Sequence, residues 1–386
     1  MPRSALLLVA LLSLAAGCVG PAAQPQPTQA SLPPAVDEVL AEGAKAYGFL
    51  YTFPMAFPDR RGTEPNHEAA RVYLEEQLAS FGLSKRRHDY GEGQNVIGVR
   101  NGTTRADEWV ILSAHYDSTS TTIYGAWDDG SGSAALLEMA RAFGSRPWNR
   151  TLAFVFFDDE ERGLVGSRHF VEEEVLGQGL KVAANLNFDP PGLNWPCANP
   201  DGTTLPVTIV PSSQETNGQH VLNDAVLMGA TDAGIPDDAV DSYTGGIPIV
   251  GVAGNNLLAG GSDHMSFDAA EVPNVFIGGG VPVEAGPVKA MSYLLHTPLD
   301  TALQMEVRCG GADLLKQGYQ AILDLTHHAL ARFDAWDGAT PPLGDGHAHA
   351  ARTQSPPGHY ARFDVVGLTT AAAVDVATQR SWAPAT

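Results

Sequence analysis

Several common signatures are scarce in this sequence of 386 residues. It contains 3 cysteines, too few for a disulfide-rich scaffold or a cysteine-rich zinc domain. Lysine and arginine total 23 against 44 aspartate and glutamate residues, which gives a formal net charge of -21. A surface of this sign repels phosphate backbones, so the composition argues against a nucleic-acid partner.

Three common catalytic motifs are also missing. No G-x-S-x-G occurs, so no serine sits on a predicted nucleophile elbow. No glycine-rich phosphate loop with its lysine is present. The pair His67 and Glu68 begins HEAAR, which lacks the second histidine of a zinc-binding H-E-x-x-H helix. These absences argue against a serine hydrolase of that type, a P-loop enzyme and an H-E-x-x-H protease.

The first 18 residues have the pattern of an export signal. Arg3 carries the only positive charge, and the apolar run over residues 5–16 is shorter than the ~20 residues of a membrane-spanning helix. Small residues then precede Cys18, as in a bacterial lipoprotein signal with a lipidated cysteine; plain secretion is the alternative. Residues 19–34, rich in Pro, Gln and Ala, predict a linker. We therefore expect an exported protein, tethered to a membrane through Cys18 or secreted.

Two cysteines and the C-terminal tail leave alternatives open. Cys197 and Cys309 could pair outside the cytoplasm, but the sequence does not place them within bonding range.

Residues 334–386 form a Gly-, Pro- and His-rich tail, partly ordered if the β-like alternation near its end forms a strand. Its His347 and His349 could bind a metal weakly, although a solvated linker is the favoured interpretation.

Helical and strand-like patterns alternate between residues 35 and 333. The sequence predicts strands over 94–99, 108–118, 151–157, 181–189 and 272–279, and helices over 67–81, 131–143, 163–176 and 310–332. Asn66 is the predicted N-cap of the first of these helices. The alternation predicts one domain over 35–333, an α/β fold that is a three-layer α/β/α sandwich with a mixed, largely parallel central sheet.

Histidines and carboxylates gather where the predicted strands end. They are His115, Asp117, Asp128, Asp129, Glu160, Glu161 and Asp189, with His296 in LLHTPLD further on. The carboxyl ends of parallel strands meet at one edge of a sheet. Carboxylates buried together there would be costly without cations. The mixture of histidine and carboxylate donors suits zinc in an open site.

Two spacings give these residues different roles. His115 and Asp117 are two residues apart, so on a strand end they point to the same face. Asp117 could then accept the second ring N–H of His115 and fix its tautomer. Glu160 and Glu161 are adjacent and point in different directions, so one can bind a metal while the other stays free as a base.

Six motifs resemble one enzyme family when they are taken in order. HYDS, GAWDDGSG, DDEERGLVGS, NFDPPG, GGSDHMSF and LHTPLDT resemble the co-catalytic dizinc exopeptidases, the secreted bacterial aminopeptidases related to leucine aminopeptidase of marine bacteria. The resemblance covers residues 45–332. It implies a metallo-aminopeptidase that hydrolyses the first bond of peptides with a free N-terminus, and we expect a monomer.

The resemblance also assigns the site. It implies two Zn2+ per chain, held by His115 and Asp189 on one ion, Glu161 and His296 on the other, and Asp128 between them. Glu160 matches the general base, which acts on a water shared by the ions, and Asp117 matches the carboxylate that orients a histidine ligand. His264 in the SDH motif matches a position that is not a ligand.

Other functions within and outside the superfamily stay open. Glutaminyl cyclases resemble this family and use a single catalytic zinc, but the compact DDEERGLVGSRHF is more similar to the peptidase branch. A carboxypeptidase or dipeptidase specificity is also open. A non-catalytic binding module is least favoured, because no predicted ligand is missing.

Tyr243 could assist the oxyanion, although a packing role is favoured. The loops between Trp195 and Gly260 are expected to form the specificity pocket or a lid.

Overall fold

The structure is a computed structural model, and it describes residues 40–198, 202, 204–242, 247–248, 258–259, 261–280 and 294–338. The predicted export signal with Cys18, the linker, Tyr243 and the tail with His347 and His349 lie outside the described residues. Parts of the predicted pocket region, among them residues 249–257, lie outside them too. Among the described residues, no helix has the length and hydropathy needed to cross a bilayer.

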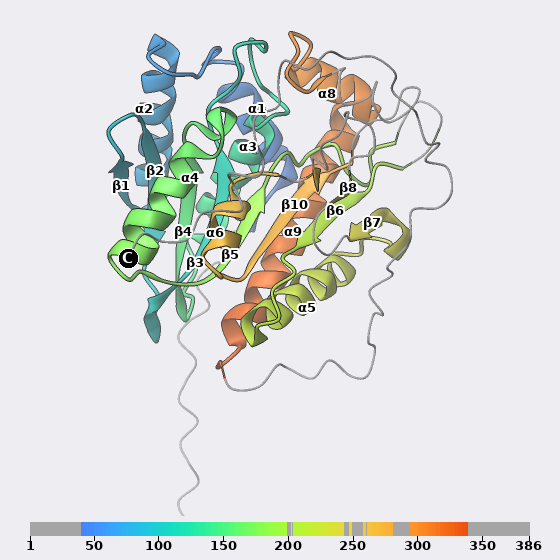
Figure 1. The fold of residues 1–386 in the computed structure, drawn as a ribbon. Coiled ribbons are helices and arrows are strands. Elements are labelled where there is room, and N and C mark those ends of the chain that lie inside the picture. Colours follow the sequence, from blue (N-terminus) through green and yellow to red (C-terminus); the bar gives the residue numbers. More distant parts are fainter. Residues whose placement is uncertain are drawn as a thin grey trace, which may run out of the picture. The chain divides into compact units, whose positions relative to one another are not determined.

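Eight strands form the central sheet in the order β1-β2-β4-β3-β5-β10-β6-β7 (Figure 1). Their bounds are β1 (Ser84–Asp89), β2 (Gln94–Arg100), β3 (Arg105–His115), β4 (Arg150–Phe157), β5 (Lys181–Phe188), β6 (Val207–Pro211), β7 (Val240–Ser242) and β10 (Asn274–Gly279). The central strands β4, β3, β5 and β10 are parallel, as are β6 and β7, whereas β1, β2 and β6 join their inner neighbours antiparallel. The predicted mixed, largely parallel sheet is confirmed. A separate ribbon pairs β8 (Ile247–Pro248) with β9 (Leu258–Ala259).

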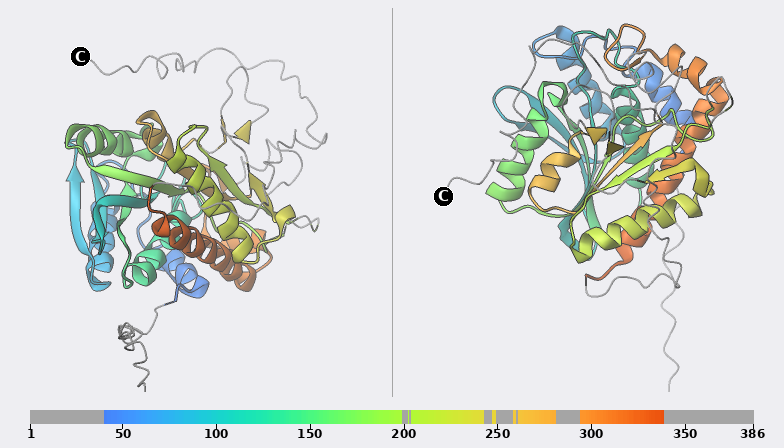
Figure 2. Two further views of the ribbon diagram at one scale, coloured as in Figure 1. Left: turned by 90° about the horizontal axis from the view of Figure 1, so that it is seen from below. Right: turned by 45° about the vertical axis from the view of Figure 1, so that its right-hand side comes forward.

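Helices cover both faces of the sheet (Figure 2). One face packs against α1 (Gly43–Thr52), α2 (Pro65–Ser80), α3 (Gly130–Phe143), α5 (Asn217–Asp232) and α9 (Ala312–Ala335), and the other against α4 (Val165–Phe170), a π-helical turn (Val171–Gly177) and α6 (His264–Ala269). Strand β3 contributes Leu112 to the larger cluster and Ile111 to the smaller one, as expected when successive side chains point to opposite faces. The predicted three-layer sandwich is therefore confirmed.

Helix α2 starts earlier than the sequence predicts. Asn66 was the predicted N-cap, but the helix begins at Pro65 with Glu64 as the N-cap, so that prediction is wrong. Proline favours the first helical position because its fixed φ suits the helix and its missing N–H would have no partner there. The Asn66 side chain instead donates to the Pro58 carbonyl at 2.7 Å.

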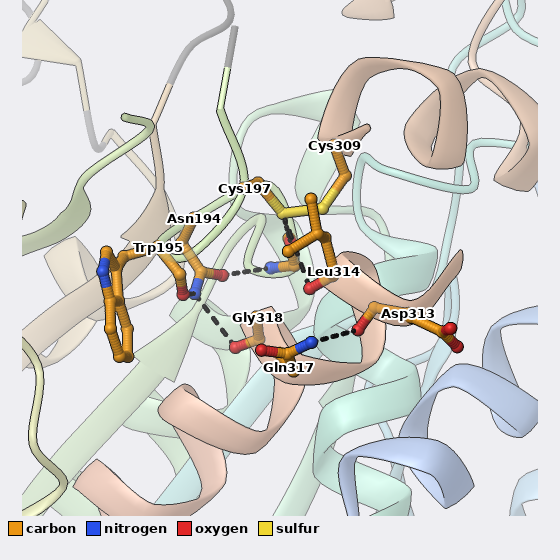
Figure 3. Close-up of a disulfide and its surroundings, with 9 residues drawn as sticks. Asn194, Trp195, Cys197, Cys309, Asp313, Leu314, Gln317 and Gly318 are labelled. Carbon is orange, nitrogen blue, oxygen red and sulfur yellow. Dashed lines mark hydrogen bonds between the residues drawn. A yellow bond between two sulfur atoms is a disulfide. The ribbon is translucent and has the colours of Figure 1, made fainter. Parts of the chain in front are cut away.

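Cys197 and Cys309 form a disulfide (Figure 3). Their Cα atoms are 4.5 Å apart, within the range that a disulfide requires. Cys197 lies in the loop that follows β5, and Cys309 ends α8 (Ala302–Cys309). Asn194 of the same loop donates to the Gly318 carbonyl of α9 at 2.9 Å. The bond and this contact attach the loop after β5 to the α8–α9 corner.

Removing this disulfide is expected to lower the stability of the fold. The two cysteines are 112 residues apart in the sequence, so the bond restricts a long stretch of the unfolded chain. We expect the Cys197→Ala/Cys309→Ala variant to lose about 2–4 kcal/mol of unfolding free energy, as measured by urea denaturation beside the oxidised wild-type protein. An unchanged midpoint and slope would show that the bond adds no stability.

Candidate metal centre

The elements of the fold bring the predicted donors to one edge of the sheet. His115 is the last residue of β3, and Asp189 directly follows β5. Glu160 and Glu161 begin a short 3-10 turn three residues after β4 ends. Because β3, β4 and β5 run parallel, their carboxyl ends lie together. His296 reaches the same place from the segment before α8.

Asp128 connects two sets of donors. Its Oδ1 lies 3.2 Å from His115 Nε2, and its Oδ2 lies 3.1 Å from His296 Nε2. Among the described residues, three groups of donor atoms lie close enough to share an ion: His115, Asp128 and Asp189; Asp128, Glu161 and His296; and an overlapping set of His115, Glu160 and Glu161. A carboxylate that presents one oxygen to each of two imidazoles has the geometry of a ligand that bridges two metal ions.

Asp117 organises both sides of this centre without belonging to a donor group. Its Oδ1 lies 3.1 Å from His115 Nδ1, on the ring edge away from Asp128. It also accepts hydrogen bonds from the backbone N–H groups of Glu160 at 3.1 Å and Glu161 at 3.3 Å. Strand β3 ends at His115, so Asp117 reaches the ring from the following loop. This geometry is the one expected of a carboxylate that fixes a ligand histidine.

Burial disfavours the charged forms of two of the donor carboxylates. Burial, together with the charge of Asp128, raises the pKa of Glu161 to about 7. Burial also raises the pKa of Asp189 to about 6, although His115 acts in the opposite direction. Glu161 Oε1 is buried without a hydrogen-bond partner among the described residues. Histidine nitrogens with carboxylate oxygens are donors that zinc accepts, so the residues present fit a divalent cation.

Glu160 stands beside the donors with its carboxylate free. Its Oε2 lies 4.0 Å from His115 Nε2, too far for a hydrogen bond, and the described residues offer its side chain no other partner. Burial raises the pKa of Glu160 well above its usual range, against the effect of the nearby His115. A carboxylate placed and perturbed in this way can accept and return a proton.

Two donor segments have left-handed backbone conformations that non-glycine residues rarely adopt. Asp159, directly before Glu160, has φ 54, and His296 itself has φ 57. Such conformations cost about 1–3 kcal/mol each, and they persist where the surrounding structure fixes them. Asp159 is held by the Tyr90 hydroxyl at 3.1 Å and by Arg162 at 3.0 Å. The fold therefore accepts local strain to aim both donor segments at the same point.

A buried ion pair supports the turn after β4. His67 Nε2 lies 2.6 Å from Asp158 Oδ1, and both side chains are buried. Burial acts to lower the pKa of His67, but Asp158 outweighs it and raises the pKa, while His67 holds the pKa of Asp158 down. In the sequence, His67 stands out only as the first residue of HEAAR, which lacks a second histidine. No pattern in the sequence indicates that α2 reaches the end of β4.

Asp300 holds the backbone at Asp128, the residue that connects the two sets of donors. It accepts hydrogen bonds from the backbone N–H groups of Trp127 at 2.6 Å and Asp128 at 3.2 Å. Asp300 lies within the LHTPLDT motif, four residues after His296, but no pattern in the sequence indicates these contacts. His264 lies outside all three donor groups; it is buried in α6 with its ring centroid 5.4 Å from that of Phe276.

Fold and site together define a candidate binuclear metal centre on a three-layer α/β/α scaffold. The chain belongs to Peptidase family M28, whose model matches residues 95–309. Curated relatives include the aminopeptidase YwaD of Bacillus subtilis, 37% identical over 26% of this chain and 22% of the relative. Another is the probable glutamate carboxypeptidase AMP1 of Arabidopsis thaliana, 41% identical over 25% of this chain and 14% of the relative. The matched stretches thus span less than a quarter of each of these relatives.

Solved structures share the fold at low sequence identity. A zinc aminopeptidase from Bacillus subtilis aligns with a TM-score of 0.57 and 16% identity over 76% of this chain and 96% of that one. A glutaminyl cyclase from Porphyromonas gingivalis aligns with a TM-score of 0.55 and 19% identity over 77% of this chain and 99% of that one. At these identities the likeness establishes the fold, and it does not separate a peptidase from a cyclase.

Proposed function

We propose that the chain is a zinc aminopeptidase that binds two zinc ions and hydrolyses the N-terminal peptide bond of its substrates. The observation that carries this proposal is the position of Asp128, whose two carboxylate oxygens face His115 and His296 separately. Asp189 completes the first set of donors and Glu161 the second. The zinc aminopeptidase of Bacillus subtilis, which shares the fold, supports the choice of metal.

The remaining residues of the site would handle the proton and the geometry. Two zinc ions bound to these donors would lower the pKa of a water and polarise the scissile carbonyl. Glu160 would take the proton from the attacking water and pass it to the leaving amine. Asp117 would hold the His115 ring in one tautomer while fixing the backbone at Glu160 and Glu161.

The charge of the site favours a substrate amino terminus over a carboxyl terminus. Carboxylates crowd the site, namely Asp117, Asp128, Glu160, Glu161, Asp189, Asp263 and Asp300. Within the described part of the chain, no lysine or arginine forms an ion pair with any of them. A carboxypeptidase needs a cationic group to receive the terminal carboxylate of its substrate. The ammonium group of a peptide N-terminus is instead attracted to a site of this sign.

The first test compares substrates that differ only in their ends. We expect the zinc-loaded protein to release p-nitroaniline from leucine p-nitroanilide and not from its N-acetylated form, because the free amine is part of the recognised group. Ammonia release from a peptide that begins with glutamine would instead identify a glutaminyl cyclase. Release of a C-terminal glutamate from an N-blocked peptide would identify a carboxypeptidase.

We further propose that the protein is exported. The signal-like residues 1–18 and the Cys197–Cys309 disulfide support this, because structural disulfides persist mainly in oxidising compartments. Such a location would give the enzyme access to extracellular peptides. Cell fractionation followed by mass analysis of the mature N-terminus would distinguish a lipid on Cys18 from plain cleavage.

A further inference from the structure

Arg60 lies between α1 and α2, and its side chain is completely buried. Among the described residues, the guanidinium donates only to backbone carbonyl oxygens, those of Pro54, Phe57, Tyr116, Tyr124 and Gly125. The guanidinium also lies 5.2 Å from the centre of the Phe53 ring. None of the described carboxylates forms an ion pair with it. Burying a charge without a direct partner is costly, so the position of Arg60 calls for a physical reason.

The contacts of the guanidinium close the loop over residues 116–125. Nε donates to the Tyr116 carbonyl at 2.6 Å, at the start of the loop. Nη1 donates to the Tyr124 carbonyl at 2.6 Å and Nη2 to the Gly125 carbonyl at 3.0 Å, at its end. The loop starts beside His115 and ends three residues before Asp128. Arg60 thus sets the distance between the segments that carry these two donors.

Further contacts hold Arg60 itself against this loop. The Arg60 N–H donates to Ser118 Oγ at 3.1 Å, and the Ser118 N–H donates back to the Arg60 carbonyl at 3.0 Å. Gly125 has φ +49, and a Cβ atom there would come within 3.2 Å of Arg60 Nη2 and 2.7 Å of the Asp128 carbonyl oxygen. A side chain at position 125 would collide with the Asp128 carbonyl and strain the backbone, so glycine lets the loop turn here beside the guanidinium.

The carboxylates of the centre balance the charge of Arg60 from a distance. Burial lowers the pKa of Arg60 to about 10, while the charges of Asp117, Asp300, Asp129 and Asp128 act to raise it. The side chain therefore remains protonated at neutral pH. It supplies a permanent positive charge to the centre while leaving the carboxylate oxygens free to bind metal.

We propose that Arg60 is a positioning residue for the metal centre, which sets the separation of His115 and Asp128 so that both can bind one ion. This inference rests on the proposed function only in that the centre binds zinc. Arg60 lies upstream of residues 95–309, which match the family model. The segment before that match thus completes a site whose predicted ligands all lie within it.

The test compares zinc affinity in variants of two buried arginines. Arg60→Met removes the charge and the hydrogen bonds, whereas Arg60→Lys keeps the charge but lacks the planar fork that reaches both ends of the loop. Arg150→Met is the matched control. Arg150 is also buried and donates to the carbonyls of Phe333 at 2.9 Å and Trp336 at 3.0 Å. It begins β4, at the end of the strand opposite the site.

Zinc affinity is measured on the full chain by competition with a chromogenic chelator, with thermal unfolding of the zinc-free form in parallel. We expect both Arg60 variants to bind zinc about 10–100-fold more weakly, the range known for residues that orient metal ligands. Arg150→Met should lose stability and keep wild-type affinity. Arg60→Lys retains most of the side-chain volume, so it provides the answer if Arg60→Met does not fold.

Wild-type zinc affinity in every Arg60 variant that folds would overturn the proposal and leave Arg60 a purely structural role. Wild-type affinity in Arg60→Lys combined with a loss in Arg60→Met would overturn the positioning role in favour of charge alone. A wild-type protein that binds zinc but cleaves no N-terminal bond would refute the proposed aminopeptidase activity without affecting the affinity comparison. A wild-type protein that binds no zinc would refute both.

Discussion

Replacing Glu160 by glutamine is expected to lower kcat/KM by about 1,000-fold, the middle of the range for general acid–base catalysis, while zinc binding stays unchanged. Glutamine keeps the size and polarity of the side chain but cannot accept the proton of the attacking water. The Glu160 carboxylate has no hydrogen-bond partner among the described residues, so the substitution leaves their contacts intact. The backbone N–H of Glu160 still donates to Asp117.

The neighbouring glutamate provides a matched control. Glu161 Oε2 lies 3.1 Å from His296 Nε2. Glu161→Gln is therefore expected to weaken the binding of one zinc ion and not to remove the proton-transfer group. Zinc content by atomic emission and kcat/KM on leucine p-nitroanilide separate the two effects. Activity retained in Glu160→Gln would show that another group is the base. Loss of zinc from Glu160→Gln would show that Glu160 is a ligand, as its presence in one donor group allows.

The sequence predicts the fold well where hydrophobic patterns are long. The apolar run 151–157 became β4, buried along its whole length, because a strand covered on both faces needs apolar residues at every position. The predicted helix over 163–176 became α4 and a π-helical turn. Helix α5 lies in a segment for which no helix was predicted, and β6 and β7 were not predicted either. Strand β7 is only three residues long, too short for periodicity to show.

The sequence predicts the site where polar residues follow a buried strand, since topology alone then brings them together. This explains why His115, Glu161 and Asp189 were found. It also explains why Arg60 and the His67–Asp158 pair were missed. Arg60 is one of several arginines in polar surroundings, and its burial depends on a loop that folds back over it. Asp158, the buried carboxylate beside His67, lies 91 residues away in the chain, and a local sequence pattern does not indicate such a contact.

Replacing Asp128 by asparagine is expected to weaken the binding of both zinc ions. The loss of affinity should exceed the roughly 10–100-fold that residues orienting metal ligands contribute. The reason is that Asp128 belongs to two donor groups, one with His115 and Asp189 and one with Glu161 and His296, and asparagine offers one oxygen and one amide NH2 group in place of two oxygens. The N–H would face either His115 or His296, each about 3 Å from a carboxylate oxygen in the wild-type protein. Aminopeptidase activity should fall to background at limiting zinc.

Asp189→Asn is the comparison that makes the result specific to a shared ligand. Asp189 belongs to one donor group, that of His115 and Asp128. Its replacement should therefore weaken the binding of one ion and leave the ion at Glu161 and His296 in place. Titration with zinc should therefore show the loss of one binding step in Asp189→Asn and of both in Asp128→Asn. If both variants lose a single step, Asp128 binds one ion only and the two sets of donors are independent. The separate orientation of its two oxygens towards His115 and His296 argues for the shared role.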